Sequence, residues 1–90
     1  MNRNELYKRM LDKFGDLQMV VAVEELSELQ KEVCKAMRGK FNKEHIAEEV
    51  ADVKIMIDQI MLHYAIQESE VQQVIDEKLK RTEERFKGEI

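Results

Sequence analysis

Proline and tryptophan are absent from this sequence, and glycine occurs only three times. Because proline and glycine are the residues that most disfavour helix interiors, their scarcity permits long helices. Cysteine occurs once, at Cys34, so no internal disulfide can form, and we expect a cytoplasmic protein. The opening stretch MNRNELYKRM lacks the apolar core of a signal peptide, and no run approaches 18 apolar residues. We therefore expect no membrane partner.

The remaining composition indicates a small, highly charged helical domain. Hydrophobic residues make up 43% of the 90 residues and charged residues 38%, which excludes a disordered chain. We expect one domain over residues 1–90. A chain of this size buries only about 60–65% of the surface that its unfolded form exposes, so self-association is expected. The net charge of −4 disfavours a nucleic-acid partner, because that binding depends on cations at the phosphate backbone.

Gly15 and Gly39, together with a short polar break at residues 67–69, divide the sequence into four segments with helical periodicity, and Gly88 follows the last of them. Asp16, Asn42 and Ser69 precede the last three segments and are expected to cap them. The expected helices span residues 4–14, 17–37, 43–64 and 70–86. The chain is therefore expected to be all-α.

Apolar stripes run along the second and third expected helices. The second stripe contains Met19, Ala22, Leu26, Leu29, Val33 and Met37. The third contains Ile46, Val50, Val53, Ile57, Ile60, Met61 and Tyr64. Both segments are amphipathic, and we expect their stripes to be buried.

Carboxylates spaced by three residues border each stripe. Glu25 and Glu28 do so on the second helix, and Glu49 and Asp52 on the third. If the two helices form an antiparallel hairpin with its turn centred between Arg38 and Gly39, Glu25 lies opposite Asp52 and Glu28 opposite Glu49. Gly39 suits a helix C-terminus, so the expected turn coincides with this centre.

The same register places Glu32 opposite His45 and Lys35 opposite Asn42. Four converging carboxylates repel one another, so protons or cations must gather among them. Oxygen ligands without cysteine suit Mg²⁺, or Mn²⁺ as its substitute, better than zinc. The spacing therefore predicts a divalent-cation site.

A structural interpretation competes with this one, because glutamate-rich helix surfaces are common and a lone E-x-x-E carries little information. His45 and His63 suit surface, packing or capping positions, and Cys34 suits a packing or surface position. A non-catalytic helical adaptor that uses its stripes to grip another protein would explain the helices and the charge. It does not explain why the acids of the two helices share one register.

The order E-E-x-x-E followed by E-x-x-D, present as EELSE at residues 24–28 and EVAD at residues 49–52, resembles the MazG-like all-α nucleoside triphosphate pyrophosphohydrolases. The likeness extends from GDLQMVVAVEELSEL through HIAEEVADVKIMIDQI to EKLKRTEERF. It implies cleavage between the α and β phosphates, giving a monophosphate and pyrophosphate. It also implies Mg²⁺ bound by the carboxylates at Glu25, Glu28, Glu49 and Asp52, and a proton acceptor at Glu24 or Glu28.

The resemblance further implies a homodimer or homotetramer, in which a hairpin and its flanking helices form a four-helix-bundle-like core completed by a second chain. On the fourth segment an apolar stripe gives way to Lys78, Arg81 and Arg85, which the resemblance assigns to substrate phosphates. Thr82 stands where some relatives have asparagine. Ion pairs of Arg81 and Arg85 with neighbouring glutamates are the alternative. The preferred base and sugar are not encoded legibly.

Overall fold

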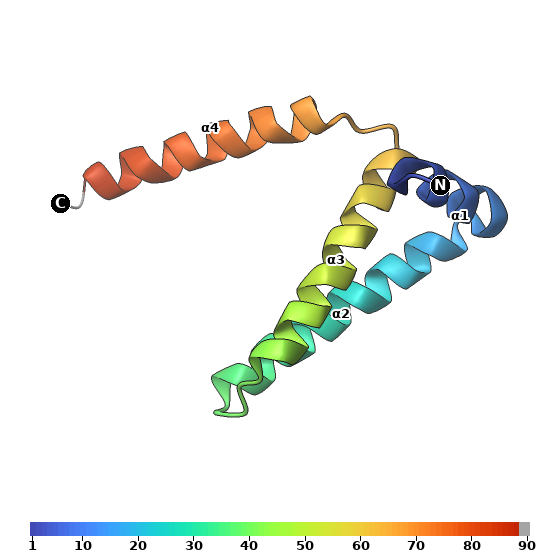
Figure 1. Ribbon diagram of the computed structural model, residues 1–90. Coiled ribbons are helices and arrows are strands. Elements are labelled where there is room, and N and C mark those ends of the chain that lie inside the picture. Colours follow the sequence, from blue (N-terminus) through green and yellow to red (C-terminus); the bar gives the residue numbers. More distant parts are fainter. Residues whose placement is uncertain (89–90) are drawn as a thin grey trace.

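The computed structural model describes residues 1–88, which form four helices joined by short turns (Figure 1). The helices are α1 (Arg3–Phe14), α2 (Leu17–Met37), α3 (Lys43–His63) and α4 (Glu68–Lys87). Strands are absent from this part of the chain. The expected all-α class is therefore confirmed.

The turn between α2 and α3 lies where the sequence places it. Gly39 has φ +87°, a conformation that costs a residue with a side chain about 1–2 kcal/mol. Its N–H donates to the carbonyl of Ala36 at 3.0 Å, and the N–H of Lys40 donates to the carbonyl of Lys35 at 3.0 Å. This is the Schellman arrangement, and it ends α2.

Of the three predicted helix caps, only that of Asn42 is confirmed. Its side chain accepts the N–H of His45 at 3.1 Å at the start of α3. Asp16 precedes α2 without a side-chain capping bond. Its carboxylate instead lies 3.2 Å from Nε2 of His63, at the far end of α3. A tertiary contact therefore replaces the predicted cap.

The prediction that Ser69 caps the last helix is also wrong, because α4 begins at Glu68 and Ser69 lies within its first turn. The preceding residue, Gln67, has extended backbone, and its N–H donates to Oε2 of Glu70 at 2.6 Å. The glutamate thus fixes the start of the helix.

The hairpin of α2 and α3 forms the centre of the molecule (Figure 1). Ala22 of α2 and Val53 and Met56 of α3 are its buried apolar side chains. Between the same helices, Nε2 of the buried Gln18 donates to Oε1 of the buried Gln59 at 2.8 Å. This amide pair was not predicted from the sequence, and it satisfies two polar groups inside the core.

The first and last helices, α1 and α4, differ in how they pack against the hairpin. At the open end of the hairpin, α1 packs against both α2 and α3 and buries Tyr7. After residues 64–67 the chain turns away, and α4 extends from the hairpin without packing along it (Figure 1). None of the helices in residues 1–88 combines the length and the apolar character that crossing a bilayer requires.

Large apolar side chains remain exposed on the hairpin. The predicted stripes are only partly buried, because Leu26, Val33 and Met37 of α2 and Ile57 and Tyr64 of α3 are exposed. The expectation of two fully buried stripes is therefore wrong for a single chain. The exposed part is apolar surface that α1 and α4 leave uncovered.

Candidate metal centre

Three of the predicted carboxylates meet between α2 and α3. One oxygen from each of Glu25, Glu49 and Asp52 lies within 4.8 Å of the other two. Glu25 and Glu49 are half-buried, whereas Asp52 is exposed. The antiparallel hairpin brings the Glu25 position opposite Asp52, so acids that are separated by the turn share one site.

Glu49 lies deepest in this acidic cluster, which we define as Glu25, Glu49 and Asp52. Its Oε2 atom is shielded from solvent and has no hydrogen-bond partner in the described part of the chain. Loss of hydration raises the pKa of Glu49 above its ordinary value, and the charge of Asp52 raises it further. Loss of hydration, followed by the charges of Asp52 and Glu49, raises the pKa of Glu25 as well. Desolvation and the neighbouring carboxylates thus both disfavour the charged forms of Glu25 and Glu49, and a proton or a cation would relieve this.

The other two predicted residues of this region, Glu28 and Glu24, lie outside the cluster. Glu28 is outside the set of converging oxygens, and its side chain is half exposed. Its Oε1 atom lies 3.7 Å from Nζ of Lys31. Even so, its charge contributes to raising the pKa values of Glu25 and Glu49. Glu24 is exposed, and it does not take part in the cluster.

A second group of polar side chains follows the cluster toward the turn. Oε1 of Glu32 lies 3.4 Å from Nζ of Lys35 and 4.0 Å from Nδ1 of His45. Glu32 also helps to raise the pKa of Glu49. The hairpin register predicted the approach of Glu32 to His45. None of these three residues was predicted as part of the site, because an E-x-x-K pair on a helix normally indicates a solvated surface.

The predicted phosphate-binding cations lie elsewhere. Lys78, Arg81 and Arg85 line a shallow groove of about 280 Å³ on α4, together with Thr82. Because α4 extends away from the hairpin, a single chain does not bring these cations to the acidic cluster (Figure 1). The alternative ion pairs of Arg81 and Arg85 with neighbouring glutamates are not observed within residues 1–88.

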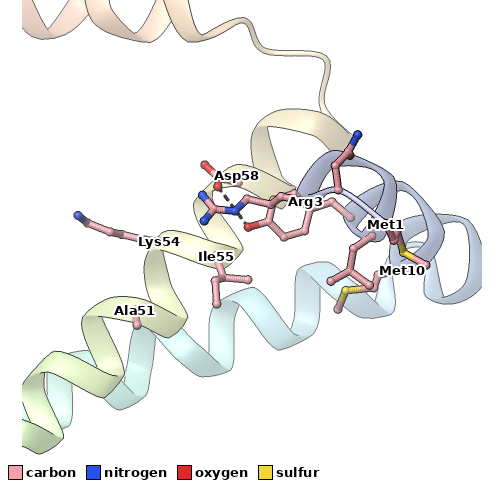
Figure 2. A pocket seen from close by; sticks show the side chains of 10 residues that line it. Met1, Arg3, Met10, Ala51, Lys54, Ile55 and Asp58 are labelled. Carbon is pink, nitrogen blue, oxygen red and sulfur yellow. Dashed lines mark hydrogen bonds between the residues drawn. The ribbon is translucent and has the colours of Figure 1, made fainter.

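A separate cavity, of about 630 Å³, lies between α1 and α3 and is lined by none of the predicted site residues (Figure 2). Met10 and Ile55 contribute to its apolar lining, and Arg3 lies at its polar end. There the hydroxyl of Tyr7 donates to Oδ2 of Asp58 at 3.3 Å. Burial raises the pKa of Tyr7, and the charge of Asp58 adds to this effect. Asp58 therefore has a structural partner, unlike the buried oxygen of Glu49.

The acidic cluster is the better candidate for metal chemistry. Its carboxylate oxygens come from two helices and suit a hard divalent cation, and the buried Oε2 of Glu49 has no hydrogen-bond partner among residues 1–88. Such a donor set can hold Mg²⁺ or Mn²⁺ with open positions for water or phosphate. Comparisons of the chain with protein-family models, curated proteins and solved structures yielded no match.

Proposed function

We propose that this protein is a Mg²⁺-dependent nucleoside triphosphate pyrophosphohydrolase, which cleaves between the α and β phosphates to give a monophosphate and pyrophosphate. The observation that carries the proposal is the convergence of Glu25, Glu49 and Asp52 within 4.8 Å. The resemblance of EELSE and EVAD to the MazG-like motif supplies the reaction type.

In this proposal Glu25, Glu49 and Asp52 bind the cation, and Glu28 approaches as a fourth ligand. A bound Mg²⁺ or Mn²⁺ would neutralise phosphate charge and lower the pKa of a coordinated water. The desolvated oxygen of Glu49 favours this assignment, because it lacks a hydrogen-bond donor. The half-buried positions of Glu25 and Glu49 keep bulk water away from one side of the site.

A carboxylate beside the cluster accepts the proton of the attacking water. Glu28 fits this role better than Glu24, because its charge acts on both Glu25 and Glu49. Its half-exposed side chain allows the proton to pass on to solvent. Glu24 remains the second candidate from the matched motif.

Self-association completes the proposed enzyme. Leu26, Val33 and Met37 recur along one side of α2, and Ile57 and Tyr64 along one side of α3. In an antiparallel pair these stripes lie on the same face of the hairpin, opposite the edge that carries the acids. Two copies that pack by this face form a four-helix bundle, either as a homodimer or within a homotetramer.

The partner chain is also the proposed source of the phosphate-binding cations. Lys78, Arg81 and Arg85 share one groove on α4, which does not pack against the hairpin of its own chain. A second copy can present this helix to the acidic cluster. Cytoplasmic action agrees with the exposed, unpaired Cys34, which would be exposed to oxidation elsewhere.

The direct test is a panel of canonical and modified nucleoside triphosphates with Mg²⁺ or Mn²⁺, in which monophosphate and pyrophosphate are both measured. Asp52→Asn should abolish the release of pyrophosphate. Asp58→Asn is the matched control, because Asp58 lies on the same helix but outside the acidic cluster. Activity that survives in Asp52→Asn would contradict the assigned site.

The exposed apolar face also suits a second function, that of a non-catalytic helical adaptor. An adaptor would neither respond to Mg²⁺ nor release pyrophosphate from any nucleotide. Failure of the whole panel, together with thermal stability that is independent of Mg²⁺, would therefore favour the adaptor.

A further inference from the structure

Basic side chains lie at the edge of the acidic cluster that faces the turn. Glu32 lies four residues after Glu28, so it is displaced by about 6 Å along α2 toward the turn. Both Lys35 of α2 and His45 of α3 approach the same Oε1 atom of Glu32, at 3.4 Å and 4.0 Å. Two groups that can bind phosphate thus approach one carboxylate beside the cluster, one from each helix.

Glu32 differs from the other lysine-paired glutamate on α2. The side chain of Glu32 is only 14% exposed, whereas those of Glu28 and Lys31 are 50% and 67% exposed. An ion pair between exposed side chains is readily exchanged for water, but a shielded carboxylate fixes its partners more firmly. Lys35 keeps 41% of its side chain exposed, so its ammonium group is held at one end and open to a ligand.

Resting on the proposed function, we propose that Lys35 and His45 bind the diphosphate portion of the substrate, and that Glu32 is the positioning residue that holds both beside the acidic cluster. A polyanionic substrate that enters a cluster of carboxylates needs cationic contacts in addition to the metal ion. Lys35 and His45 are in place within one hairpin, whereas the cations of α4 are not. The leaving pyrophosphate would therefore lie toward the turn.

Inorganic pyrophosphate is the probe for this assignment, and its affinity is measured by calorimetry on the full chain with saturating Mn²⁺. Lys35→Met should weaken pyrophosphate binding about tenfold, the usual effect of losing a charged hydrogen bond. Lys54→Met is the matched control, because Lys54 lies on the cavity side of α3, and it should bind pyrophosphate as the wild type does. Mn²⁺ affinity, measured by electron paramagnetic resonance, should be the same in all three proteins.

Glu32→Gln gives a test whose sign separates positioning from simple charge. If Glu32 were only one more negative charge, its removal would reduce repulsion and strengthen pyrophosphate binding. If Glu32 is a positioning residue, Glu32→Gln should weaken pyrophosphate binding. The loss of affinity caused by Glu32→Gln should be smaller in the Lys35→Met background than in the wild type. Circular dichroism would verify that each variant is folded.

Two results would overturn the assignment alone: unchanged pyrophosphate binding in Lys35→Met, or tighter binding in Glu32→Gln. A wild-type protein that binds Mn²⁺ but no pyrophosphate would overturn both this assignment and the proposed function. The two failures are therefore distinguishable.

Discussion

Replacing Asp52 with asparagine should change stability in opposite directions with and without metal. The oxygens of Asp52 and Glu25 lie within 4.8 Å, where two unit charges repel by about 0.9 kcal/mol at the dielectric constant of water. The water value applies because Asp52 is exposed. Asp52→Asn removes this repulsion with little change in shape. For a domain of this size, the melting temperature of the metal-free protein should rise by about 4–7 °C.

Saturating Mg²⁺ should reverse the order of the two melting temperatures. A ligand at a hundred times its dissociation constant stabilises the fold by about 2.7 kcal/mol, so the wild type should gain more than about 10 °C. Asp52→Asn loses one of the three converging ligands and should gain little. The wild type is thus the less stable protein without Mg²⁺ and the more stable one with it.

The assay is thermal unfolding followed by circular dichroism at one protein concentration and low ionic strength, because added salt screens the repulsion. Asp58→Asn provides the comparison, since its side chain can still accept the hydroxyl of Tyr7. It should respond to Mg²⁺ as the wild type does. A lower melting temperature of metal-free Asp52→Asn, or equal Mg²⁺ responses of Asp52→Asn and the wild type, would refute the reasoning.

Three further predictions concern the fold and its charges. Because burial raises the pKa values of Glu25 and Glu49, the stability gained from protonating them is complete below the ordinary carboxyl value of 4.5 and is lost as pH rises through the raised values. In urea unfolding without metal, Glu49→Gln should therefore be more stable than the wild type near neutral pH. A stability difference between the two proteins that grows as the pH is lowered would argue against this reasoning. Gln59→Leu should lower the free energy of unfolding by about 1–3 kcal/mol by leaving Gln18 unpaired, whereas Gln18→Leu with Gln59→Leu should recover much of the loss; simple additivity would count against the amide pair. Gly39→Ala should cost about 1–2 kcal/mol in the same assay because of its positive φ, and an unchanged urea midpoint would show that the turn relaxes.

The helices could be located from the sequence because their ends are determined locally. The turn after α2 has a positive φ at residue 39, which glycine adopts without strain, and Asn42 caps α3 through its own side chain. Asp16 failed as a cap because its own backbone is helical (φ −61°, ψ −19°), and its carboxylate contacts His63 on another helix. Periodicity contains no information about such a long-range contact.

Burial was harder to predict than helix position. The stripe of α2 correctly identified Ala22 as buried, but Leu26 and Val33 are exposed. They are exposed because the acidic edge of this helix turns toward α3, as the half-buried Glu25 shows. An amphipathic pattern does not say which edge meets a neighbour within the chain. Gln59 is fully buried, and a polar residue gives no apolar signal from which to predict this.

The part of the candidate site that depends on the hairpin register could be predicted from the sequence. Placing the turn at Gly39 put Glu25 opposite Asp52, and the structure brings both to Glu49. The side-chain directions that leave Glu28 at the edge depend on packing and rotamers, which spacing does not determine. The pairing of Glu32 with His45 followed from the same register, but its shielding from solvent did not.

Anomalous diffraction from crystals grown with Mn²⁺ tests the central claim most directly, because it locates the cation independently of turnover. The account predicts an anomalous peak bound by carboxylate oxygens of Glu25, Glu49 and Asp52, which disappears in crystals of Asp52→Asn. Ordered crystals of the wild type in which Mn²⁺ binds elsewhere, while these three carboxylates bind none, would contradict it.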